Sequence, residues 1–109
     1  MSETSEIMAL AVVEAFDGKD EECLQLLHEF YGLLRRKQYS HDLLYRDQKD
    51  PRRFINIRYW RSEEARAEAQ EDPDVHKFWQ RLSEISQVAP VFERLADVTP
   101  QDLIAKQQG

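Results

Sequence analysis

The sequence predicts an α+β fold in which one antiparallel sheet carries helices on a single face. Three patterns lead to this prediction. An almost unbroken apolar run over residues 7–16 is typical of a strand buried on both faces, and the segment after it has the three- and four-residue spacing of an amphipathic helix. Residues 53–61 then alternate between two sets of side chains, as the residues of a strand do.

The first half of the chain contains three of the expected elements. The first strand stops at Gly18, and a helix follows over about residues 20–37. One apolar stripe runs along this helix and consists of Cys23, Leu26, Leu27, Phe30, Leu33 and Leu34. Residues 39–47 form a second, less regular strand. The turn-like segment 48–52 follows, so this strand and the next one are expected to form a hairpin.

The second half of the chain predicts two shorter helices and a last strand. Ser62 can accept hydrogen bonds from the first N–H groups of a helix, which the Asp72-Pro73 pair interrupts. The helix after this interruption has the apolar residues Val75, Phe78, Trp79, Leu82 and Ile85. Pro90 precedes the last strand, expected over about residues 91–98, and a short helix or tail is expected over residues 99–109.

The order of these elements is that of a ferredoxin-like split βαβ sheet with strand order 4-1-3-2. The folded domain is expected over residues 7–98, after a disordered N-terminus at residues 1–6. The sheet face away from the helices would carry Ile55, Ile57 and Tyr59. A face that apolar needs a cover. A second copy packed sheet against sheet would provide it, which predicts a homodimer that forms a dimeric α/β barrel.

Composition excludes several classes of protein. The net charge of −6 over 109 residues argues against a nucleic-acid partner. No apolar run is long enough for a membrane span and no secretory signal opens the chain, so a soluble, cytoplasmic protein is expected. The single cysteine, Cys23, and histidines without metal-ligand spacing predict no metal site. The chain has three glycines and no phosphate-binding loop, so no nucleotide or flavin cofactor is expected.

The alternating strand at residues 53–61 contains the candidate site. It places Phe54, Asn56, Arg58 and Trp60 on one side, where Asn56 and Trp60 lie about 13 Å apart. Trp60 can be core packing or a pocket wall, and Asn56 can make a structural hydrogen bond or contact a ligand, because a buried amide needs a partner. Arg58 can extend to the sheet edge or hold an anionic substrate group.

Two short segments resemble the antibiotic biosynthesis monooxygenase family: residues 60–65 (WRSEEA), where a strand ending in an aromatic residue enters a helix, and residues 76–78 (HKF). The resemblance covers about residues 7–97. It implies a dimeric α+β barrel that holds small aromatic substrates or haem between the sheet and the helices. In members that oxidise anthrone-type compounds without a cofactor, an Asn and a Trp four residues later lie in the pocket, and Asn56 and Trp60 match this spacing. Arg66 and Gln70 stand where such members often have a polar aromatic residue and a histidine.

The leading hypothesis is a cofactor-independent monooxygenase or quinol oxidase that acts on a small planar aromatic substrate. The NH₂ group of Asn56 would stabilise the substrate anion, Trp60 would wall the pocket, and His76 would transfer a proton. Arg58 and Phe78 are the predicted substrate-binding residues. One alternative is a non-catalytic dimeric ligand-binding or stress-associated module. Another is a haem-degrading monooxygenase in which His76 is the axial ligand.

Overall fold

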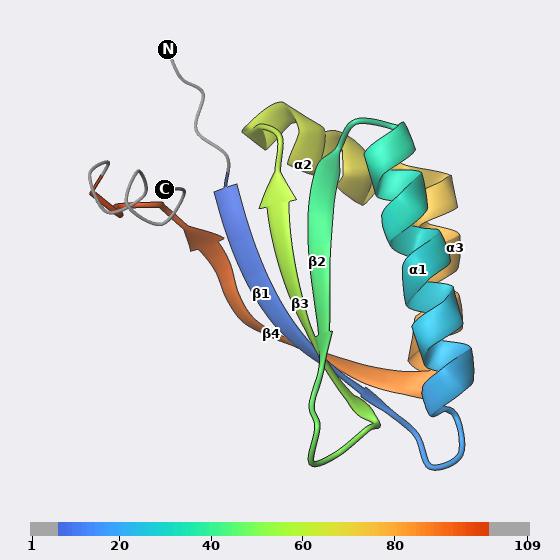
Figure 1. Ribbon diagram of the computed structural model, residues 1–109. Coiled ribbons are helices and arrows are strands. Elements are labelled where there is room, and N and C mark those ends of the chain that lie inside the picture. Colours follow the sequence, from blue (N-terminus) through green and yellow to red (C-terminus); the bar gives the residue numbers. More distant parts are fainter. Residues whose placement is uncertain (1–6, 101–109) are drawn as a thin grey trace.

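The computed structural model describes residues 7–100 and shows the predicted order of elements (Figure 1). The elements are β1 (Ile7–Ala15), α1 (Asp20–Arg36), β2 (Ser40–Arg46), β3 (Arg53–Trp60), α2 (Glu63–Glu71), α3 (Pro73–Ile85) and β4 (Ser86–Leu95). The predictions for residues 1–6 and 101–109 lie outside the described residues. None of the described helices is long and apolar enough to cross a membrane.

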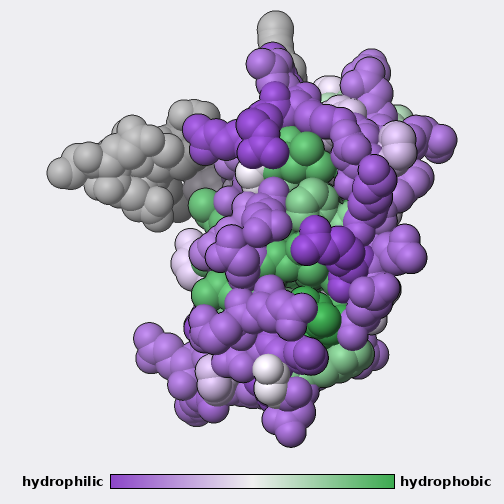
Figure 2. Space-filling view, turned by 90° about the vertical axis from the view of Figure 1, so that its right-hand side faces the viewer, coloured by the Kyte–Doolittle hydropathy of each residue, from purple (hydrophilic) through white to green (hydrophobic). Residues whose placement is uncertain are grey.

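The four strands form one antiparallel sheet in the order β2-β3-β1-β4, which confirms the predicted topology. The β2–β3 hairpin is also confirmed, with Ser40 opposite Trp60 at one end and Arg46 opposite Phe54 at the other. The long helices α1 and α3 lie side by side on one face of the sheet (Figure 1). Seen from this side, hydrophilic residues dominate the surface, and hydrophobic residues show mainly in a strip along the middle (Figure 2).

The core lies between the sheet and these helices. The alternation of β3 turns Phe54, Asn56 and Trp60 toward the helices, and all three are buried. The apolar stripe of α1 packs against them through Cys23, Leu26, Leu27, Phe30 and Leu34. The alternating residues of β3 and the apolar stripe of α1 therefore pack against each other in one interface.

The opposite face of the sheet is apolar and carries no described helix. By strand alternation and register, the apolar residues of this open face include Met8, Leu10, Val12, Leu43, Tyr45, Ile55, Ile57 and Tyr59. Leu43 is 41% exposed and Tyr45 is 55% exposed. Side chains of this kind are usually covered when they gather on one surface.

The last strand differs from its prediction. β4 begins at Ser86, five positions before the expected start at residue 91, and it includes Pro90. A proline has no N–H to donate to a neighbouring strand, and within a sheet it is confined to edges and bulges. β4 is an edge strand, and Pro90 lies opposite Ala11 next to a shift in register. Pro90 therefore interrupts the regular pairing without ending the strand.

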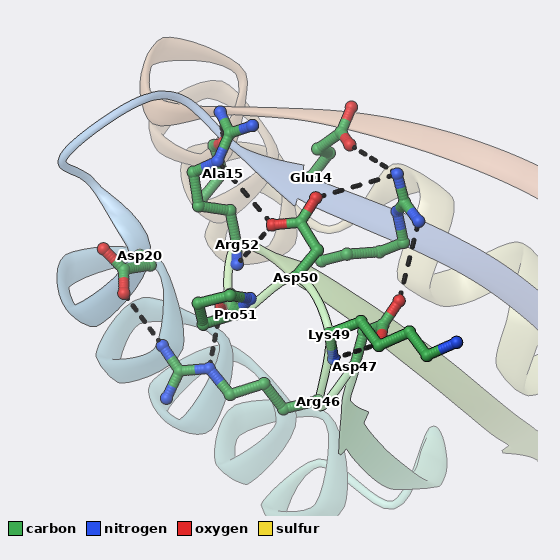
Figure 3. A network of polar contacts seen from close by, with 10 residues as sticks. Glu14, Ala15, Asp20, Arg46, Asp47, Lys49, Asp50, Pro51 and Arg52 are labelled. Carbon is green, nitrogen blue, oxygen red and sulfur yellow. Dashed lines mark hydrogen bonds and ion pairs between the residues drawn. The ribbon is translucent and has the colours of Figure 1, made fainter.

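A polar network fastens the β2–β3 turn to the neighbouring elements (Figure 3). Arg46 donates from Nη2 to Asp20 at the start of α1 (3.1 Å) and from Nε to the carbonyl of Pro51 (2.7 Å). Arg53 donates from Nη2 to Glu14 on β1 (3.1 Å). These contacts join the turn to α1 and β1, although exposed ion pairs of this kind add little stability singly.

Asp72 separates the two shorter helices and caps the second one. Its Oδ1 accepts from the N–H of Asp74 (2.8 Å), and Pro73 occupies the first turn of α3. Its Oδ2 accepts from Lys37 Nζ (2.8 Å) and from the hydroxyl of Tyr39 (2.7 Å). The interruption predicted at this position is thus a cap tied to the end of α1.

Acid should weaken this link. The bonds from Lys37 and Tyr39 lower the pKa of Asp72 to about 2, so its stabilising contribution is complete above the pKa of an unfolded aspartate and is lost as the pH falls toward about 2. The stability difference between wild type and Asp72→Asn should therefore shrink between about pH 4 and pH 2. Urea unfolding at a series of pH values measures it, and a constant difference over this range would contradict the expectation.

Candidate functional site

A cavity of about 560 Å³ lies between the sheet and the helices. This volume is within the usual range of small-molecule sites, about 300–1,000 Å³. β3 supplies Asn56, Arg58 and Trp60 to its wall, and α1 supplies Phe30 and Tyr31. The three β3 residues that the sequence placed on one side therefore line one cavity.

Asp42 on β2 is the centre of the polar contacts behind this wall. It lies opposite Arg58 in the hairpin register, and its side chain is 0% exposed. It accepts hydrogen bonds from the hydroxyl of Ser40 (2.9 Å), from Asn56 Nδ2 (3.0 Å) and from Arg58 Nε (2.6 Å). A buried carboxylate is stable only with such partners. Asp42 was not among the residues predicted from the sequence.

Asp42 also fixes the orientation of the Asn56 amide. Asn56 Nδ2 donates to Asp42 and to the carbonyl oxygen of Leu43 (3.3 Å), and the reversed amide would place its oxygen against a carboxylate. Both N–H groups of the amide are therefore directed at the protein. The predicted donation from this NH₂ group to a substrate anion does not fit the geometry. The Asn56 oxygen accepts no hydrogen bond from residues 7–100.

Arg58 lies among three aromatic rings. Its guanidinium carbon is 5.4 Å from the ring centre of Phe30, 5.5 Å from that of Tyr31 and 5.2 Å from that of Trp60. The side chain is 14% exposed, and within the described chain its hydrogen bond is the one from Nε to Asp42. Cation–π contacts of this kind hold the guanidinium plane in place. Its Nη1 and Nη2 groups make no hydrogen bond to a described residue.

Tyr31 adds a phenol to the same cavity wall. Burial raises its pKa well above the ordinary value; Arg58 opposes this rise and Asp42 adds to it. The phenol is therefore neutral at physiological pH, and its O–H can donate a hydrogen bond to a ligand. Tyr31 was considered on the sequence only as one of several tyrosines, because nothing local to it indicates a cavity.

Neither His76 nor Phe78 is among the residues that line the cavity. The His76 ring stacks on Trp79, with ring centres 5.4 Å apart, and its Nε2 contacts the carbonyl oxygen of Gln70. Phe78 is partly buried, stacks on Phe30 with ring centres 5.3 Å apart and packs against the core, so the predicted contact with substrate does not fit its position. His76 thus contacts two residues that line the cavity, Gln70 and Trp79, but is not itself part of the lining, which does not fit direct proton transfer or haem ligation by His76.

Solved structures share this arrangement of elements. SnoaB from Streptomyces nogalater, a cofactor-independent oxygenase, superposes with a TM-score of 0.76 at 15% identity, over 89% of this chain and 99% of that one. A protein from Bacteroides thetaiotaomicron, named as a candidate antibiotic biosynthesis monooxygenase, superposes with a TM-score of 0.75 at 13% identity, over 88% of this chain and 92% of that one. The chain has the antibiotic biosynthesis monooxygenase fold.

Another structure of this fold, from Nitrosomonas europaea, matches with a TM-score of 0.70 at 13% identity, over 89% of this chain and 96% of that one. No protein-family model and no curated protein matches this chain in sequence. The superpositions establish the fold. Because the identities are low, the chemistry has to be argued from the site itself.

Proposed function

We propose that this protein is a cofactor-independent monooxygenase or quinol oxidase that acts on a small planar aromatic substrate. The observation that carries the proposal is the cavity of about 560 Å³, lined by aromatic residues and by Arg58, whose guanidinium lies among three of their rings. The fold that it shares with a cofactor-independent oxygenase supports the same reading.

In this proposal the substrate supplies the electrons for its own oxidation. Ionised as a phenolate or enolate, it is oxidised by dioxygen. In the quinol oxidase reaction the quinol loses two electrons and two protons and becomes a quinone, and dioxygen takes them up and becomes hydrogen peroxide. In the monooxygenase reaction one oxygen atom replaces two hydrogens of a CH₂ group as a carbonyl, and the other leaves with those hydrogens as water. The phenol of Tyr31 donates a hydrogen bond to the anion, and the nearby positive charge of Arg58 stabilises it electrostatically. Trp60 walls the pocket, and Asn56 positions Arg58 indirectly, because both bind Asp42.

Oxygen uptake tests this proposal. The purified protein should consume oxygen faster than autoxidation with at least one member of a panel of reduced quinols and anthrones. Asn56→Ala should lower this uptake by about 10²-fold, because a small displacement of a positioned group has effects of this size. His76→Ala is the control and should retain uptake. Uptake that is equal in wild type and Asn56→Ala would show that Asn56 takes no part in the reaction, and no uptake above autoxidation with any member of the panel would contradict the proposal.

We also propose that a second copy covers the open face of the sheet, giving a homodimer. The exposure of Leu43 and Tyr45 there supports this, because apolar side chains gathered on one face mark an interface. Wild type should sediment as a dimer and Ile57→Glu as a monomer. Gln80→Glu, which adds the same charge on the exposed side of α3, should remain dimeric. A monomeric wild type would contradict this proposal.

A further inference from the structure

The cavity contains hydrogen-bond donors without a described partner. A guanidinium has five N–H groups, and Arg58 uses the one on Nε for Asp42. The four on Nη1 and Nη2 donate to no residue in the 7–100 range, although the side chain is 14% exposed. Donors left unpaired in so confined a place are costly, so water or a ligand must accept from them.

We propose that the ligand which pairs with Arg58 is a planar aromatic carboxylate. This inference rests on the proposed function and names the substrate class of that same site. The end-on pair Nη1 and Nη2 presents parallel N–H groups that match the two oxygens of a carboxylate. A phenol or ketone offers a single oxygen and uses only part of this fork.

Asp42 positions the guanidinium of Arg58 for such a ligand. Its carboxylate already accepts from Ser40, Asn56 and Arg58, so it anchors Arg58 by the Nε edge and leaves Nη1 and Nη2 available to a ligand in the cavity that Arg58 lines. The ion pair also makes this part of the wall close to neutral. A ligand carboxylate at Arg58 therefore meets hydrogen-bond donors and is kept from the Asp42 charge, since the Asp42 side chain is 0% exposed.

A second ion pair at the cavity is longer and more exposed than that of Arg58 with Asp42. Arg66 on α2 and Glu93 on β4 both line the cavity, and Arg66 Nη2 lies 3.4 Å from Glu93 Oε1. The neutral phenol of Tyr31 adds a further donor and no negative charge. Two arginines, Arg58 and Arg66, and one glutamate, Glu93, line the cavity. This local balance of charge allows an anion to bind although the whole chain has a net charge of −6.

The aromatic part of the ligand follows from the rings around Arg58. Phe30, Tyr31 and Trp60 lie within 5.5 Å of its guanidinium carbon, and Trp79 lines the same cavity from α3. A planar ring system attached to a carboxylate on Arg58 would extend between these faces, where offset stacking is favourable.

Calorimetric titration with two matched probes tests this inference without any turnover. 2-Naphthoate and naphthalene-2-carboxamide have nearly the same shape and differ in charge. Wild type should bind the naphthoate at least about tenfold more tightly, because bidentate pairing with Arg58 requires the carboxylate. In Arg58→Gln this preference should disappear while carboxamide binding stays the same. Arg58→Lys, which keeps the charge without the fork, should retain only part of the preference.

Binding must also occur in this cavity. The two tryptophans of the chain, Trp60 and Trp79, both line it, so naphthoate should shift both indole N–H signals in an NMR spectrum, and Trp79→Phe assigns them. Equal affinity of wild type for the two probes, no binding of either, or indole signals that do not move would overturn the inference. Should Arg58→Gln fail to fold, the comparison of the two probes on wild type still decides it. Oxygen uptake that fails while the preference stands would refute the oxidation alone.

Discussion

Asp42→Ala is expected to lower the free energy of unfolding by about 3–5 kcal/mol, the cost typical of removing one partner from a buried ion pair. The carboxylate is 0% exposed and accepts from Ser40, Asn56 and Arg58. Without it, the Arg58 cation is left in a confined space with no anion, and two further buried polar side chains lose an acceptor. Urea unfolding followed by circular dichroism measures the loss.

A double variant separates two contributions to this loss: the missing hydrogen bonds of Asp42 and the unpaired charge of Arg58. Asp42→Leu combined with Arg58→Met removes both charges and keeps apolar volume, so it should recover most of the stability that Asp42→Ala loses. Asp42→Ser, which leaves a hydroxyl but no charge, should resemble Asp42→Ala. A loss below about 1 kcal/mol in Asp42→Ala would mean that water already solvates Arg58, and the ion pair would then not organise the cavity wall.

The parts of the site that local pattern determines could be predicted from the sequence. The alternation of residues 53–61 identifies which side chains of β3 share a face, because successive strand residues point to opposite sides. Apolar spacing on α1 identifies the face that covers them. Asn56, Arg58 and Trp60 could therefore be placed together before the structure was known. Element order and right-handed connections then limited the sheet to one order of strands.

The partner of these residues depends on strand register, which no local pattern specifies. Asp42 meets Arg58 only because the turn after Arg46 sets the pairing of β2 with β3, and a shift of one residue would turn Asp42 to the open face. The polar network around Arg46 and Arg53 joins that turn to α1 and β1, and its members come from separate parts of the chain. The sequence feature that could have indicated this partner is an acidic residue, Asp42, in the expected second strand.

The position of His76 could have been predicted more closely. The buried positions of α3 are Val75, Leu82 and Ile85, and His76 follows Val75 by one residue, about 100° around the helix. Its ring is therefore directed away from the buried stripe and meets Trp79 and Gln70 instead. The resemblance to a family motif drew attention to His76, and helical geometry indicates the outer position.

Asn56→Asp should be strongly destabilising at neutral pH and much less so in acid. It places a second carboxyl group where Asn56 Nδ2 now lies 3.0 Å from Asp42 Oδ2. Two buried carboxylates at this distance cannot both ionise, so the pair takes up a proton and its higher pKa rises above that of an unfolded aspartate. A raised pKa in the folded state means that stability is complete at low pH and is lost as the pH rises. The loss relative to wild type should reach the order of 4 kcal/mol above pH 7.

The control for this prediction is Asn56→Leu, which removes the same hydrogen bonds without adding a titratable group. Its loss of stability should be nearly independent of pH between about 4 and 8, whereas the loss in Asn56→Asp should grow over the same range. Urea unfolding of both variants and wild type at several pH values gives the comparison. Parallel curves for the two variants would show that the amide does not face Asp42. Asn56 would then be free to turn its NH₂ group toward a ligand, as its spacing from Trp60 first suggested.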